Sequence, residues 1–216
     1  MMATMAPRLP GDPCNIIITG VGGQGNVMAA RVLAGMLANR GYMITIGETF
    51  GASQRGGSVM SHIRASVQGT WSPRMPKGSA HIVVALEPVE ALRVLSDYGH
   101  PGVIVLANTR PVYPIDVITG ELGYPSPSEI EAALLRLSAE LWMIDATDRA
   151  VSLGNAVLAN IIMVGALTAL NILPVSADDF RIVIERIVTE ERLGADLEAF
   201  SAGMGSVGAS CCAPGL

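Results

Sequence analysis

Apolar residues fall into two patterns along the chain: short β-branched runs, and longer stretches with apolar positions at helical spacing. Short continuous runs of this kind are typical of buried strands in parallel sheets. The first two predicted strands enclose a helical stretch over 26–40, so the first fifty residues predict a strand–helix–strand unit. The predicted strands are Asn15–Thr19, Tyr42–Gly47, Ser58–Ser66, His81–Leu86, Val103–Ala107 and Trp142–Asp145.

Helical stretches separate the later strands. Proline is favoured in the first turn of a helix and glycine just after its last turn, and Pro88 and Gly99 bracket one such stretch. Ser128 and Ser176 are the expected N-caps of two others, the second with an acidic residue three positions later. We expect a loop or hairpin over Ile115–Pro127, and helices over 26–40, Pro88–Gly99, Ser128–Leu141, Leu153–Leu173 and from about Ala177.

Strands that alternate with helices predict an α/β fold. We expect a Rossmann-like three-layer domain with a mainly parallel sheet and C-terminal helices. The chain shows no internal repeat and no linker long enough to divide it into two domains. The predicted organisation is a flexible N-terminal tail over 1–13, a single domain over 14–204 and a flexible C-terminal tail over 205–216.

The segment Leu153–Leu173 contains no charged residue and is long enough to span a bilayer. Three asparagines within it, Asn155, Asn160 and Asn171, would be costly in lipid. A helix buried in the core or at a subunit interface is therefore the better interpretation, since a helix apolar on all sides must be covered. The N-terminus shows no apolar signal segment, so we expect a cytoplasmic protein with no membrane partner.

Composition narrows the classes of partner and cofactor. Half of the 216 residues are hydrophobic and only 15% are charged, a low fraction that suggests a surface covered by another protein. The net charge is −5 and the basic residues form no cluster, which disfavours nucleic acid. Cys14, Cys211 and Cys212 include no CxxC pair, so we expect no zinc ribbon or iron–sulfur cluster on this chain alone.

A complete catalytic set is also missing from the sequence. His62, His81 and His100 have no metal-ligand spacing, and each is expected to be structural. No GxSxG nucleophile motif is present, and Asp145 and Asp148 are expected to cap a loop. The sequence therefore predicts a binding scaffold, with neither a metal site nor catalytic residues of its own.

The strongest motif is Gly20-x-Gly22-x-x-Gly25, which follows a predicted strand and precedes a helix. Glycines allow positive φ and close approach of a ligand, and the helix N-terminus attracts an anion such as phosphate. Glu48 lies 23 residues after Gly25, where a dinucleotide fold places its ribose-binding carboxylate. The motif has three interpretations: an anion site, a true NAD(P) site or a purely structural turn.

A second glycine-rich loop ends with Arg55, Gly56, Gly57 and Ser58. An arginine beside flexible backbone is a candidate ligand for a phosphate or a carboxylate, because its planar fork binds both oxygens. The loop begins at the carboxyl end of the second predicted strand, where open α/β sheets bind ligands. The alternative is an interface loop that organises a neighbouring subunit.

The two loops together carry a family resemblance. ITGVGGQGNVMAARVLA followed by GETFGASQRGGSVMSHIR resembles the gamma-type subunit of 2-oxoacid:ferredoxin oxidoreductases, and most of all the beta subunits of indolepyruvate ferredoxin oxidoreductases. The likeness continues through PRMPKGSAHIVVALEPVEAL, VLANTRPVYP and DLEAFSAG. It covers nearly the whole chain after the N-terminal tail.

The resemblance implies a subunit of a larger enzyme. Such enzymes decarboxylate a 2-oxoacid on thiamine diphosphate, pass two electrons through iron–sulfur clusters to ferredoxin, and release an acyl-CoA. By this likeness, a large partner subunit holds the thiamine diphosphate and the clusters. This chain would hold no cofactor tightly, would contact coenzyme A and would assist assembly, with a second copy of the chain as another partner.

The same resemblance implies the site residues. Gly20, Gly22, Gly23, Gln24 and Gly25 would line a phosphate-accepting turn, while Arg55, Gly56, Gly57 and Ser58 would form a second wall or contact the thiamine-bearing subunit. Two alternatives stay open. One is a self-sufficient NAD(P)-dependent dehydrogenase that uses Gly20, Gly22, Gly25 and Glu48, and the other is a non-enzymatic dinucleotide- or CoA-binding module.

Overall fold

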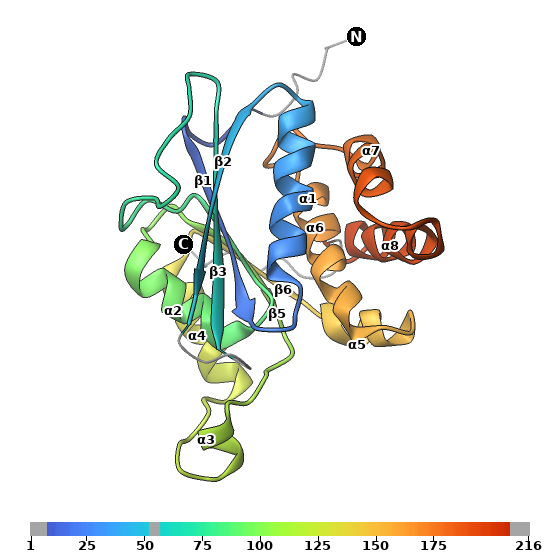
Figure 1. Cartoon of the computed structure of the whole chain (residues 1–216). Coiled ribbons are helices and arrows are strands. Elements are labelled where there is room, and N and C mark those ends of the chain that lie inside the picture. The colour runs from blue at the N-terminus through green and yellow to red at the C-terminus, as the bar shows by residue number, and fades with distance from the viewer. Residues whose placement is uncertain (1–7, 52–56, 208–216) are drawn as a thin grey trace.

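The computed structural model describes residues 8–51 and 57–207. A six-stranded sheet lies between two layers of helices (Figure 1). The strands are β1 (Cys14–Val21), β2 (Met43–Phe50), β3 (Ser58–Ser66), β4 (Ile82–Ala85), β5 (Ile104–Asn108) and β6 (Glu140–Ile144). The helices are α1 (Asn26–Asn39), α2 (Pro88–Tyr98), α3 (Ile115–Ile118), α4 (Pro127–Leu137), α5 (Ala146–Ser152), the 3-10 turn η1 (Ala156–Leu158), α6 (Ala159–Ala169), α7 (Ala177–Ile187) and α8 (Glu190–Met204).

The sheet is mainly parallel, as predicted, with strand order β2-β3-β1-β4-β5-β6. β1, β4, β5 and β6 pair in parallel, whereas β3 is antiparallel to both of its neighbours. Because β3 separates β1 from β2, the first fifty residues do not form a simple strand–helix–strand unit. The predicted strand, helix and strand are present in that order, but β1 and β2 are not neighbours in the sheet, because the later strand β3 pairs with both of them.

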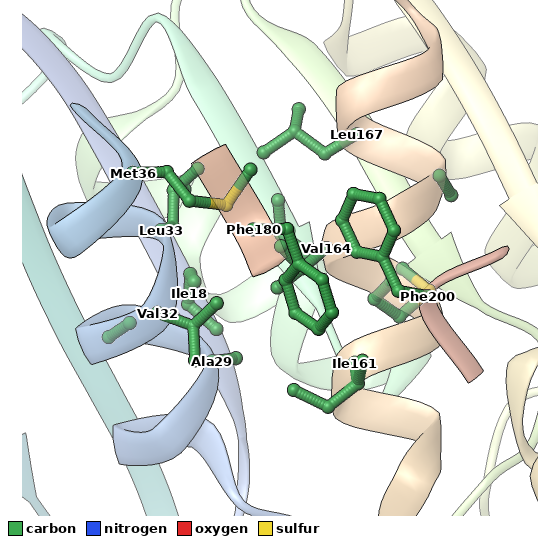
Figure 2. Close-up of a cluster of buried hydrophobic side chains, with 14 of the residues drawn as sticks. Ile18, Ala29, Val32, Leu33, Met36, Ile161, Val164, Leu167, Phe180 and Phe200 are labelled. Carbon is green, nitrogen blue, oxygen red and sulfur yellow. The ribbon is translucent and has the colours of Figure 1, made fainter. Parts of the chain in front are cut away.

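Two hydrophobic cores fill the spaces on either side of the sheet. Alternation along β1 sends Ile16 and Ile18 to one core and Ile17 to the other. Helices α1 and α6 cover the first face, with α7 and α8 packed on their outer side, and α2 and α4 cover the second face (Figure 1). In the first core Phe180 lies between α1 and Phe200 (Figure 2). The five strands other than β3 run in the same direction, so their carboxyl ends and the loops that follow them lie at one edge of the sheet.

The uncharged stretch near residue 160 is a buried helix, as expected. Ten of the eleven residues of α6 are buried, and α8 crosses it closely enough that Gly165 and Gly203 have no space for a Cβ atom. Asn155 caps η1 by accepting a hydrogen bond from Val157 N–H. Within residues 8–51 and 57–207, no helix has both the length and the apolar character needed to cross a membrane.

Several predicted boundaries were wrong. Ser126, not Ser128, is the N-cap of α4, and the helix ends at Leu137 before β6 begins. The loop expected over 115–127 contains the short helix α3, and α5 and α8 are separate helices that the pattern did not resolve. β2 also extends through Phe50, into residues expected to form a loop.

The two predicted tails stay predictions, because residues 1–7 and 208–216, with Cys211 and Cys212, lie outside the described residues.

Candidate functional site

The two glycine-rich loops meet at the carboxyl edge of the sheet. Gly22 N–H donates a 2.9 Å hydrogen bond to the carbonyl of Gly57, and Val21 pairs with Ser58 across the β1–β3 ladder. Their meeting leaves a hollow of about 510 Å³, here called the glycine pocket. It is lined by Gly22, Gly23, Gly25, Asn26, Val27, Phe50, Gly51, Gly57, Ser58 and Val59.

The turn after β1 holds a fixed shape. Gly23 and Gly25 have φ angles of +95° and +83°, which only glycine adopts readily. The Gln24 side chain stabilises the turn, since its Oε1 accepts from Val21 N–H and its Nε2 donates to the carbonyl of Leu86, both at 2.9 Å. Gln24 therefore ties the turn to the end of β4, a positioning role that the sequence motif did not indicate.

Gly20 has a packing role in the same turn. It lies buried within β1, and a Cβ atom there would come 2.5 Å from Gln24 Oε1 and 2.7 Å from Asn26 Oδ1. Gly20 is absent from the residues that line the glycine pocket. The first glycine of the motif thus makes room for the side chains that brace the turn.

Helix α1 begins at the floor of the glycine pocket without a side-chain cap. The unpaired N–H groups and dipole of such a helix end favour an anion. Asn26, in the first turn, is 3% exposed and donates from Nδ2 to the carbonyl of Val21. Its Oδ1 has no hydrogen-bond partner among the described residues. The pocket thus offers unpaired backbone donors at the start of α1, and sequence reasoning missed Asn26, which braces the turn beside them.

Asn160 supports the turn from the opposite side. It is 2% exposed on α6, and its Nδ2 donates to the carbonyl of Gly25 at 3.2 Å. A Cβ on Gly25 would lie 1.9 Å from this nitrogen. The polar residue in the middle of the apolar helix is therefore explained by its bond to the glycine turn.

A second hollow, of about 180 Å³, lies on the other side of Gly23. It sits between β1 and β4, whose following helices lie on opposite faces of the sheet, a point where open α/β sheets bind ligands. Arg110 lines it and forms an exposed ion pair with Asp148 at 3.0 Å. The other lining residues are Gln24, Leu86, Val112, Thr147, Ala156, Val157 and Ala159.

A buried pair of carboxylates holds the loops around these hollows. Glu90 is 4% exposed and accepts a 2.6 Å hydrogen bond from Ser58 Oγ. Glu87 is 2% exposed and accepts from Tyr124 Oη and from Val112 N–H. Burial raises the pKa of Glu90 above its ordinary value. The pair fixes the second glycine-rich loop and the segment after β5 to the start of α2.

The Glu90→Gln substitution should change how stability depends on pH. The pKa of Glu90 is higher in the folded protein than in the unfolded chain, where it is about 4.5. Protonated Glu90 therefore stabilises the fold fully below the unfolded pKa, and this stabilisation is lost as the pH rises through the folded pKa. Glutamine keeps an acceptor for Ser58 but does not titrate. The free energy of unfolding of the variant should therefore rise relative to the wild type as pH increases across this range, measured by urea denaturation between pH 4 and 8. A pH-independent difference would contradict this assignment.

Other predicted residues lie apart from the pocket. Arg55 and Gly56 fall outside the described residues. Glu48 is exposed on β2, with β3 between it and the strand that leads into the glycine turn. His81 Nδ1 accepts from the backbone N–H of Asn15, the structural role expected for it. The geometry required for ribose binding by Glu48 is therefore not present.

Two other titratable side chains, His62 and Cys14, are buried away from the hollows. His62 lies buried against Tyr98, and burial lowers its pKa. Burial also raises the pKa of the Cys14 thiol to about 12, which keeps it protonated. Across residues 8–51 and 57–207, no group of three or more His, Cys, Asp or Glu side chains could hold a metal ion.

Comparisons with a family model and with known sequences identify the same group of enzymes. The family model "Pyruvate ferredoxin/flavodoxin oxidoreductase" matches residues 15–206. The chain is 36% identical over 191 residues to "Indolepyruvate oxidoreductase subunit IorB" of Pyrococcus horikoshii, a match that covers 88% of this chain and 94% of that subunit.

Solved structures share the fold. The gamma subunit of a keto/oxoacid ferredoxin oxidoreductase from Geobacter sulfurreducens PCA aligns with a TM-score of 0.66 at 21% identity, covering 91% of this chain and 99% of that one. The 2-oxoglutarate:ferredoxin oxidoreductase of Magnetococcus marinus, determined with 2-oxoglutarate, coenzyme A and succinyl-CoA bound, aligns with a TM-score of 0.70 at 21% identity. That match covers 93% of this chain and 32% of the longer one.

Proposed function

Because the chain belongs to the pyruvate ferredoxin/flavodoxin oxidoreductase family, we propose that it is the small gamma-type subunit of a 2-oxoacid:ferredoxin oxidoreductase. The preferred substrates are indolepyruvate and related aryl pyruvates, a class supported by the IorB relatives. The complete enzyme converts the 2-oxoacid and coenzyme A to an acyl-CoA and CO₂, and reduces ferredoxin.

The proposal divides the work between two subunits. The larger partner holds thiamine diphosphate, which when bound supplies the decarboxylation chemistry, together with the iron–sulfur clusters. The described residues of this chain do not fit a cluster, since Cys14 is buried with a pKa of about 12 and cluster ligands are thiolates. The chain contributes binding energy, orientation and exclusion of water.

The observation that carries the proposal is the glycine pocket. Coenzyme A combines phosphate groups with an adenine ring and a pantetheine arm, whose methyl and methylene groups alternate with amides. The uncapped N-terminus of α1 suits a phosphate, while Val27, Phe50 and Val59 offer apolar surface in the same pocket. Phe50 is 61% exposed, so it is free to stack against a ring.

Binding of coenzyme A to the purified chain tests the pocket. The Phe50→Ala substitution should raise the Kd for coenzyme A about three- to tenfold, because it removes an aromatic contact surface without touching the core. Isothermal titration calorimetry is the measurement. Val67→Ala, which alters a 65% exposed side chain outside the pocket, is the matched control and should leave the Kd unchanged. Equal affinities in all three proteins would place coenzyme A elsewhere.

Activity assays distinguish the alternatives. The chain alone should neither oxidise indolepyruvate nor reduce NAD(P)⁺, and it should support ferredoxin reduction when combined with its thiamine-bearing partner under anaerobic conditions. NAD(P)⁺ reduction by the chain alone would establish the dehydrogenase alternative. Coenzyme A binding with no effect on any partner's turnover would establish the binding module.

A further inference from the structure

The segment between β5 and α4, here called the α3 excursion (residues 109–126), projects beyond the carboxyl edge of the sheet (Figure 1). It is 18 residues long, and ordered connections of this length in compact domains are usually functional. Its only regular structure is the four-residue helix α3, which buries none of its side chains. Helix α3 therefore contributes no buried side chain to the core of this chain, whereas Tyr124 near the end of the excursion packs against the second core.

The surface of the excursion is strongly apolar. Fifteen large hydrophobic side chains are exposed among the described residues, and five of them lie within eleven residues of this segment. Ile115 and Ile118 are 68% and 69% exposed. Exposed apolar surface concentrated in this way marks a site of protein association. The five side chains are Val112, Tyr113, Ile115, Ile118 and Leu122.

An apolar hollow of about 120 Å³ opens at the base of the excursion. Tyr113 and Tyr124 form one wall, with their rings edge to face and 4.9 Å apart. Four prolines, Ile130 and Met143 complete most of the lining. A hollow of this size accepts one leucine- or phenylalanine-sized side chain, the kind of anchor that dominates binding energy at protein interfaces.

The charged residues around the excursion indicate what kind of protein surface would bind it. Residues 109–131 contain four acidic residues and a single basic one, Arg110, which is already paired with Asp148. Asp116, Glu121 and Glu129 are exposed around the apolar centre. A partner that covers this surface must present an apolar side chain between lysine or arginine residues.

The excursion is also fixed to the candidate site. The buried carboxylate of Glu87 accepts from Tyr124 Oη and Val112 N–H, and its neighbour Glu90 accepts from Ser58 of the glycine pocket. Arg110 and Val112 line the second hollow directly. A protein bound to the excursion would therefore lie beside the glycine turn and close the open side of the site.

We propose that the α3 excursion is the docking surface for the thiamine-bearing subunit, which inserts an apolar side chain into the hollow walled by Tyr113 and Tyr124 and surrounds it with basic residues. This inference rests on the proposed function. It explains why five exposed apolar side chains lie together at the edge of the sheet where ligands bind.

The first test measures affinity for the thiamine-bearing subunit that co-purifies with the chain from its native host. The double variant Ile115→Asp with Ile118→Asp should bind at least tenfold more weakly by surface plasmon resonance, since two apolar contacts become charges. Ile182→Asp with Ile187→Asp on α7, at 43% and 42% exposure, is the matched control and should bind like the wild type. Thermal unfolding of each chain alone checks that all fold.

The second test addresses charge. Asp116→Arg with Glu121→Arg should slow association and reduce its dependence on salt, because attraction toward a basic surface is lost. Unchanged association kinetics would contradict the predicted basic surface on the partner.

Three results would overturn the docking proposal. In the first, the Ile115/Ile118 variant binds the partner as tightly as the wild type does. In the second, the α7 control loses as much affinity as that variant. In the third, sedimentation shows that the wild-type chain is a dimer and the Ile115/Ile118 variant a monomer, with no loss of affinity for the partner. The last result would assign the surface to a second copy of the chain. If the wild-type chain binds its partner and the α3 variant binds equally well, only the docking surface is wrong. If the wild-type chain binds no thiamine-bearing subunit, the proposed function fails as well.

Discussion

Replacement of Gly203 by alanine should destabilise the protein by about 3 kcal/mol or more. The added Cβ would lie 2.1 Å from the carbonyl oxygen of Ile162 on α6, a distance that no rotamer change can relieve because the contact is with backbone. Gly165 faces the same crossing and would meet the carbonyl oxygen of Phe200 at 2.2 Å. The two helices would have to separate, which would open the core beneath them.

Gly194 provides the matched control on the same helix. It lies within α8, and a Cβ there would meet nothing within 4 Å. Gly194→Ala should stabilise the protein by about 0.5–1 kcal/mol, because alanine loses less backbone entropy in a helix. Chemical denaturation of the three proteins measures both effects. Similar stabilities for the Gly203 and Gly194 variants would show that the α6–α8 crossing is looser than described.

The second large effect is expected for Phe180→Ala, with a loss of about 3–5 kcal/mol. Phe180 is fully buried on α7 and stacks on Phe200 of α8, with ring centroids 3.9 Å apart. Figure 2 shows it between α1 and α6, in the same cluster as Leu33 and Val164. Truncation removes the stack on α8 and the packing against α1 and α6, and leaves a cavity that the surrounding backbone elements prevent from closing.

Ile182, two residues along α7, gives the comparison for this variant. Its side chain is 43% exposed, so Ile182→Ala should cost less than about 1 kcal/mol. Thermal and urea unfolding of both variants separate core packing from any general effect on α7. If the Phe180 variant were as stable as the Ile182 variant, α7 and α8 would have to repack freely on the sheet.

Strand positions were largely predictable because buried strands carry continuous apolar runs. The order of the strands was not, since the alternating pattern of β3 indicates a strand but does not reveal which strands it pairs with. The sequence itself contains the signal that identifies the N-cap of α4. Both Ser126 and Ser128 have a glutamate three positions later, but Pro127 is favoured at the first helical position and therefore selects Ser126.

The candidate site was predictable only where it is local. The spacing of the glycines indicates the first turn, and the structure joins Gly22 of that turn to Gly57 by a hydrogen bond. The braces of that turn could not be predicted, because Asn160 lies 135 residues from its partner Gly25 and Glu90 lies 32 residues from Ser58. Buried polar residues in otherwise apolar helices are the sequence signal that such long-range bonds exist.

The antiparallel strand β3 has a consequence for insertions and deletions. Because β3 pairs with both β1 and β2 along its length, the ladders from Cys14–Ala65 and Met43–Ser66 determine that Ser58 lies opposite Val21. A single residue inserted within β3 would move the side chains that follow it to the opposite face of the sheet. The distance of Gly57 from Gly22 therefore depends on the length of a whole strand and not only on the glycines themselves.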